Sequence, residues 1–254
     1  MPVTIAAFIW IALLGTFSGL LIGCIGIGGV ILVPALIFLA GLPIQAAIPA
    51  AMFAYILSGL VATAIFARNK SIHWGMAMWL CLAATPAAFA GAWAVSVFDP
   101  RLLAALLGLL TFLSGLNALR TQKLADLSDK EVPGKVLLII GAVTGFLSSV
   151  TGTGGPMVLV PILISMSVPV LTAVGLSQAI QLPVAIAATL GNILYGKLDM
   201  TLAGVLAASL TVGSWFGAHL AHSVPRAVLR GIVSAVLVVI GAFILANVCW
   251  RLVR

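Results

Sequence analysis

The chain has 254 residues, of which 63% are hydrophobic and only 7% are charged, and its formal net charge is +7. Soluble domains carry about 25% charged residues, so this composition excludes a water-soluble fold and indicates that lipid faces most of the surface. The basic residues lie singly or in pairs between apolar runs. That pattern is typical of helix ends in a membrane protein and argues against nucleic-acid binding.

Short polar or Gly/Pro breaks divide the apolar sequence into about ten helical segments, which predicts an all-α polytopic membrane protein. In chain order we expect helices at 4–23, 29–40, 44–66, 74–97, 101–119, 136–150, 155–168, 170–194, 199–221 and 227–249. A full membrane span needs about 20 residues. The segments at 29–40, 136–150 and 155–168 fall short of that length.

A hydrophilic stretch at 120–135 separates a first transmembrane repeat, 1–119, from a second, 136–254. The two halves share residues at a constant spacing of 126 positions. The pairs are Gly19 and Gly145, Gly28 and Gly154, Gly29 and Gly155, Pro43 and Pro169, Thr63 and Thr189, and Gly91 and Gly217. Duplication of this kind is common in secondary transporters.

Both repeats start alike, since GTFSGLLIGCIGIGGVILVP at 15–34 matches GAVTGFLSSVTGTGGPMVLVP at 141–161. Each stretch predicts a helix, a Gly-rich break and a short helix, which together fit a hairpin dipping partway into the membrane. If three spans follow each hairpin, the odd number of crossings inverts the second repeat, and the two breaks approach each other near the midplane. The helix lengths favour this inverted arrangement over a parallel one with four spans in each repeat.

The basic residues test the orientation. On the inverted arrangement one side holds Arg68, Lys70, Arg120, Lys123, Lys130, Lys135, Arg226 and Arg230, and the other holds Arg101, Lys197, Arg251 and Arg254. The richer side is expected to be cytoplasmic, which leaves both termini outside. The parallel arrangement also gives a strong excess on one side and would put both termini inside, so the charge rule does not separate the two.

The Gly-rich breaks are the first candidate substrate site. They contain Gly26, Gly28 and Gly29 in the first repeat and Gly152, Thr153, Gly154 and Gly155 in the second. Each directly precedes a short helix, whose N-terminal N–H groups and positive dipole end suit an anion. The alternative is that these glycines only allow close helix packing. Their recurrence in both halves favours a site.

These features resemble the TauE/SafE sulfite exporter family of membrane anion permeases. The resemblance covers nearly the whole chain and rests on its length, the duplication, and the Gly-Gly break followed by an apolar helix with a proline. The matching residues are Gly28, Gly29 and Pro34, and Gly154, Gly155 and Pro161. The resemblance implies transport of sulfite or a small organosulfur anion across the bacterial inner membrane.

The segment at 170–194 carries the most polar face inside the membrane, with Gln178, Gln181 and Asn192 on one helical stripe. Intramembrane amides need partners, so this stripe is expected to point inward. Gln178 and Gln181 are candidate substrate ligands, with interhelical bonding the equal alternative, and bonding is favoured for Asn192. The matching stripe of the first repeat is almost apolar and offers Tyr55.

No Asp or Glu lies clearly inside a predicted span. Cation and proton transporters usually carry one there, so its absence favours an anionic or neutral substrate. We therefore expect a multi-pass secondary transporter of a small anion in the lipid bilayer. We expect no metal or cofactor, and the sequence leaves a homo-oligomer open. The alternatives are a transporter of another solute, such as an amino acid or a metal cation, and an intramembrane enzyme. No HExxH or GxSxG motif supports an enzyme.

Overall fold

The computed structural model describes residues 5–25, 29–120, 132–196, 198–220, 238–239 and 241–246. The described residues up to Leu220 form nine α-helices, and no described residue lies in a strand, which confirms the all-α prediction. The helices are α1 (Ile5–Ile25), α2 (Gly29–Phe38), α3 (Ile44–Arg68), α4 (Trp74–Val97), α5 (Pro100–Arg120), α6 (Gly134–Thr151), α7 (Pro156–Ser165), α8 (Val170–Tyr195) and α9 (Met200–Leu220). Residues 238–239 and 241–246 are also helical, and the rest of the last predicted segment lies outside the described residues.

Proline sets the start of several helices. Pro43, Pro133 and Pro169 have extended backbones, and their carbonyls accept the first helical hydrogen bonds of α3, α6 and α8. Because Pro133 starts α6 at Gly134, this helix has 18 residues and is a candidate span, whereas the sequence predicted a short segment. Among the described residues, α3, α4, α6, α8 and α9 are long and apolar enough to cross a membrane.

Polarity is distributed as lipid requires. Large apolar side chains point outward, and Trp10, Met78 and Leu194 are 66%, 71% and 66% exposed. Polar side chains such as Ser18 and Gln178 are buried instead. A surface of this kind is stable only against hydrocarbon, so the protein is a multi-pass membrane protein.

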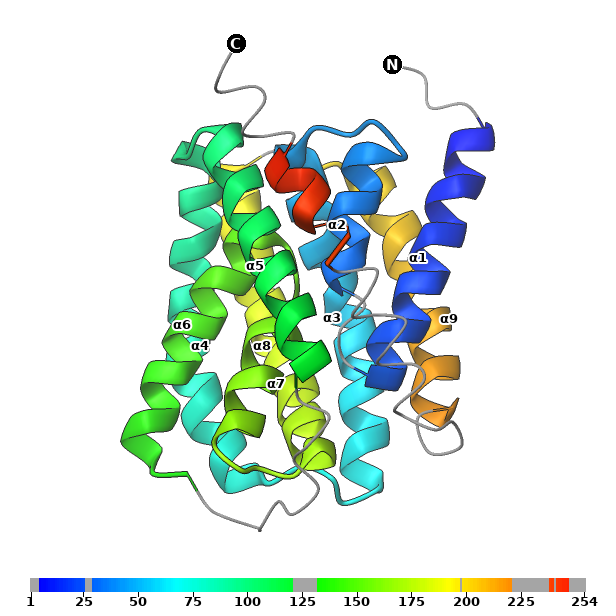
Figure 1. The fold of residues 1–254 in the computed structure, drawn as a ribbon. Helices are drawn as coiled ribbons and strands as arrows, with labels where there is room; N and C mark the ends of the chain where they lie inside the picture. The colour runs from blue at the N-terminus through cyan, green and yellow to red at the C-terminus, as the bar shows by residue number, and fades with distance from the viewer. Residues whose placement is uncertain are drawn as a thin grey trace.

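The helices form a bundle in which α1, α3 and α9 run in one direction and α4, α6 and α8 run in the other (Figure 1). In this view α3 and α9 begin at the upper end of the bundle, and α4 and α8 begin at the lower end. The most extensive helix pairs are α1 with α9 and α4 with α6, while α3 and α8 contact each other between these pairs. The first helix of each half therefore packs along a helix of the other half.

Glycines allow these helices from different halves to pack closely. A Cβ atom on Gly19 would overlap the backbone carbonyl of Leu210, and one on Gly145 would overlap that of Ala84. Gly19 and Gly145 lie 126 positions apart, as do Ala84 and Leu210. The same backbone contact is thus made twice, with the two halves exchanged.

Two helices reach only partway across the bundle. α2 and α7 have 10 residues each, which is about 15 Å and half of a hydrocarbon core. α1 descends from the upper end of Figure 1 and α2 returns to it, whereas α6 rises from the lower end and α7 returns there. The two hairpins therefore enter from opposite ends and turn back inside the bundle.

Candidate functional site

The turn between α6 and α7 places irregular backbone inside the bundle. Gly152 ends α6 in the left-handed conformation with φ 71°, and the N–H of Thr153 donates to Ser148 O at 3.1 Å. Gly154 and Gly155 follow with φ 78° and 108°, values that L side chains rarely adopt. All four residues from 152 to 155 are buried. The predicted second break is therefore a real interruption of the helix, built on glycine.

This turn offers hydrogen-bond donors. No described residue accepts from the backbone N–H of Gly154 or Gly155. The hydroxyl of Ser148 is buried without a partner among the described residues, 4.0 Å from where a Cβ on Gly155 would lie. Further along, the N–H groups of Val158 and Leu159 donate to Gly155 O, and Pro156 has no N–H. The donors therefore come from the turn itself and from Ser148, and α7 adds the positive end of its dipole.

The corresponding turn of the first half lies between Ile25, the last residue of α1, and Gly29, the first of α2. Gly26 and Gly28, which the sequence also predicted as ligands, lie outside the described residues. Gly29 is buried, and a Cβ on it would overlap the carbonyl oxygen of Thr153. The start of α2 is thus in direct contact with the α6–α7 turn, as expected if the two breaks approach each other.

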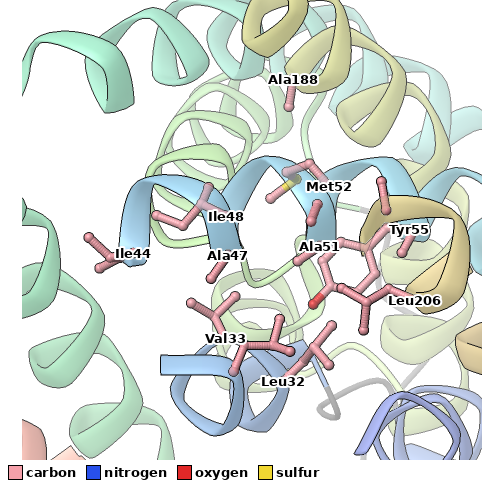
Figure 2. Packing of buried hydrophobic residues seen from close by; sticks show 14 of the residues in the cluster. Leu32, Val33, Ile44, Ala47, Ile48, Ala51, Met52, Tyr55, Ala188 and Leu206 are labelled. Atoms are coloured by element: carbon pink, nitrogen blue, oxygen red, sulfur yellow. The ribbon is translucent and has the colours of Figure 1, made fainter. Parts of the chain in front are cut away.

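Tyr55 of α3 lies between the two hairpins. Its side chain is fully buried, and its hydroxyl donates to Gly29 O at 3.3 Å. Its ring lies 3.0 Å from the position of a Cβ on Gly154. Figure 2 shows the ring between α3 and α2 with the hydroxyl oxygen directed toward α2. Tyr55 therefore touches both hairpins, although no local pattern in the sequence relates it to Gly154.

Two amides of α8 contact the first hairpin and α3. Gln178 Nε2 donates to Ile22 O at 2.9 Å, in the last turn of α1, where carbonyls lack helical partners. Gln181 Nε2 lies 3.5 Å from Ser58 Oγ. The Oε1 atoms of both glutamines are buried without a partner among the described residues. Buried polar atoms are normally paired, so these oxygens mark places where water or a solute would bind.

Asn192 has a different position. Its side chain is 1% exposed, and neither side-chain polar atom has a partner among the described residues. It lies 14 residues after Gln178 on the same helix, which is about 21 Å along the axis. The bonding expected for Asn192 is therefore not seen among the described residues, and the residue is distant from the hairpin turns.

Every charged side chain whose exposure is described lies on the surface near a helix end. They are Arg68, Lys70, Asp99, Arg101, Lys135 and Asp199. Asp199 caps α9, because its carboxylate accepts from the N–H groups of Thr201 and Leu202 at 2.9 and 3.1 Å. In the described ranges no three His, Cys, Asp or Glu side chains come close enough to hold a metal ion. The site between the hairpins is consequently polar but uncharged in its described part.

A family model described as "Sulfite exporter TauE/SafE" matches residues 11–244. The chain belongs to the TauE/SafE family. It is 26% identical over 250 residues to the probable membrane transporter protein MJ0441 of Methanocaldococcus jannaschii, covering 92% of this chain and 93% of that protein. It is 23% identical over 247 residues to the probable membrane transporter protein YunE of Bacillus subtilis, covering 87% and 89%. No solved structure gives a significant match.

Membership of the TauE/SafE family makes this chain a membrane transporter rather than an enzyme. Two residues of the candidate site were not predicted from the sequence, namely Ser148 and Ser58. Ser148 stands four positions before Gly152 on α6, so a hydroxyl one turn before a helix-ending glycine was the available signal. Ser58 had none, because its relation to Gln181 joins α3 to α8.

Proposed function

We propose that this TauE/SafE member is a secondary transporter of a small anion, with sulfite or an organosulfur anion such as a sulfonate as its substrate. The observation that carries the proposal is the α6–α7 turn, where the buried N–H groups of Gly154 and Gly155 and the Ser148 hydroxyl have no described partner. These donors and the positive end of α7 replace water around a negative solute without a buried cation. The description of the family supports sulfite in particular.

The pathway we propose runs between the hairpins. Gly29, Gly152, Thr153, Gly154 and Gly155 supply its backbone wall, and the sequence makes Gly26 and Gly28 candidates for the same role in the first half. Tyr55 contacts both hairpins, and Tyr55, Gln178 and Gln181 supply the side-chain wall of the proposed pathway. Binding at a neutral site suits transport, because an anion held by dipoles is released more readily than one held by a buried arginine.

We also propose that the two halves are inverted repeats and that the side of Arg68, Lys70 and Lys135 is cytoplasmic. The opposite entry of the two hairpins and the exchanged contacts at Gly19 and Gly145 support this arrangement. On that side a cavity of about 350 Å³ is lined by Arg68, Asn69, Trp215 and His219 together with Ile65 and Ala218. Arg68 and the neighbouring Lys70 attract anions to this mouth.

In this arrangement the units that move during alternating access are not the two halves of the sequence. Each unit combines helices from both halves. α1 is bound to α9, and α4 to α6, through backbone contacts at glycine. The α3–α8 contact is looser, since a Cβ on Gly59 would be 3.4 Å from both Gln181 Cγ and Leu182 N. We therefore place the rocking motion at α3 and α8, beside the hairpin turns.

The test is flux of labelled sulfite into liposomes containing the purified protein. Gly154→Leu should abolish the flux while the protein still inserts and stays monodisperse, because the side chain fills the turn against Tyr55. Gly204→Leu is the matched control, since Gly204 is exposed on α9 with nothing within 4 Å of its Cβ position. Undiminished flux in Gly154→Leu would refute the pathway. No flux of any small anion in the unaltered protein would refute the function.

A further inference from the structure

The acceptor atoms of the candidate site bear on which ionic form of the substrate it takes. Gln178 is 0% exposed, and its amide orientation is determined by its neighbour: a backbone carbonyl accepts hydrogen bonds, so the atom facing Ile22 O must be Nε2. Oε1 is then the free atom, and none of the described residues donates to it. An amide oxygen can only accept, so its partner is either a hydrogen-bond donor or a cation.

A second acceptor lies one turn away on the same helix. Gln181 Oε1 is also buried without a described donor, and Gln181 is 1% exposed. The α6–α7 turn, which α8 contacts through Ile180 beside Gly155, carries donors from Gly154, Gly155 and Ser148. The hairpin wall therefore offers hydrogens to a negative oxygen, and the α8 wall offers oxygens to a hydrogen.

Charge limits the solute further. All described charged side chains are exposed at helix ends, so among the described groups only helix dipoles and hydrogen bonds stabilise an ion between the hairpins. The cost of moving an ion into a low-dielectric site rises with the square of its charge, so a dianion costs about four times as much as a monoanion. A metal cation is disfavoured as the partner of Gln178 Oε1, because the positive end of α7 begins at the turn that α8 contacts through Ile180.

We infer that the site selects a singly charged oxyanion that itself carries a hydrogen-bond donor, such as hydrogensulfite or a hydroxyl-bearing sulfonate, over dianions and over monoanions without a donor. This inference rests on the proposed function and narrows it to one ionic form. The anionic oxygens face the α6–α7 turn, and the donor faces Gln178 Oε1. The dianionic form of the same solute is excluded on charge, and its donorless analogue leaves the amide oxygen unpaired.

Two pairs of ligands separate charge from donor in a binding assay on the purified protein. Isethionate and ethanesulfonate are both stable monoanionic sulfonates, and only isethionate has a hydroxyl. We expect isethionate to bind about tenfold more tightly, the effect of one unsatisfied buried acceptor. Sulfate, a dianion, should bind at least about tenfold more weakly than isethionate. Sulfite should bind more tightly on the acidic side of its second ionisation, with isethionate as the pH control.

Variants assign the donor preference to one atom. Gln178→Leu removes the acceptor and should reduce the isethionate preference to within about threefold, while Asn192→Leu, a buried amide of α8 distant from the turns, should leave it unchanged. Ligand binding by the unaltered protein tests the inference even if Gln178→Leu does not fold, because Gln178 also holds the end of α1.

Each outcome decides a different claim. Equal binding of isethionate and ethanesulfonate, or binding of sulfate as tight as isethionate, overturns the inference and leaves anion transport standing. Stabilisation by sodium ions alone that Gln178→Leu abolishes also overturns it, because Oε1 would then be a cation ligand. Failure of every anion in the series to bind overturns the proposed function itself.

Discussion

Gly154 gives the sharpest test of the hairpin geometry, because two separate costs oppose any side chain there. Its φ of 78° is left-handed, which costs an L residue about 1–2 kcal/mol. An alanine Cβ would lie 3.0 Å from Cδ2 and 3.2 Å from Cε2 of Tyr55, and forcing extra atoms into a packed interior costs about 1–3 kcal/mol. Gly154→Ala should therefore lower the free energy of unfolding by about 2–5 kcal/mol.

Gly41 isolates the first of these costs. It has φ 66°, close to that of Gly154, but nothing lies within 4 Å of its Cβ position. Gly41→Ala should therefore lower the free energy of unfolding by only about 1–2 kcal/mol and leave transport intact. The difference between the two variants measures the contact between the α6–α7 turn and Tyr55.

The assay is denaturant unfolding of the purified protein in detergent, with flux into liposomes measured in parallel. In a Tyr55→Leu background, Gly154→Ala should lower the free energy of unfolding by less than it does in the unaltered protein. Gly41→Ala should lower it by the same amount in both backgrounds. If Gly154→Ala is no less stable than Gly41→Ala, or if Tyr55→Leu changes both equally, Tyr55 does not pack against this turn and the description of the site is wrong.

Three further outcomes follow from the same structure. In a background without native cysteines, Lys70→Cys should react with an impermeant thiol reagent only from the cytoplasmic side and Asp199→Cys, at the start of α9, only from the other; labelling of both from the same side would contradict the inverted arrangement. Gln178→Ala should weaken the apparent affinity in flux assays about tenfold without abolishing flux, and complete loss would show that the amide does more than accept one hydrogen bond. Asp199→Ala should lower the free energy of unfolding by about 1 kcal/mol through loss of the α9 cap, with substrate affinity unchanged; a shifted affinity would place Asp199 in the pathway.

Local chemistry explains why much of the helix order was predictable. Proline and glycine mark helix ends through backbone effects that do not depend on distant contacts, so the starts of α3 after Pro43 and α8 after Pro169 could be derived from sequence. The Gly154–Gly155 break was predictable for the same reason. The length of α6 was misjudged because Pro133 was included in the polar linker, although proline is favoured just before a helix.

Features that depend on distant parts of the chain were not predictable. Tyr55 appeared as a polar member of an almost apolar stripe, and only the fold brings it to Gly154, 99 positions further on. The sequence predicts that Gln178 is a buried amide, but it does not predict which of the two polar atoms of that amide has a partner. The end of α1 decides this, because Ile22 O accepts from Nε2. Pairing across the bundle has no signature in either helix alone.

The pairing of α1 with α9 has a consequence for biosynthesis. α1 is made before α9, but Gly19 of α1 packs against Leu210 of α9, and Gly213 and Gly217 of α9 pack against Thr16 and Leu20 of α1. Until α9 is made, the small-residue face of α1 is exposed to lipid. The first half alone therefore lacks the helix against which α1 packs. If the chain is cut in the central linker, folded protein should consequently be obtained only when both pieces are made in the same cell. Each piece supplies the helix against which the first helix of the other piece packs.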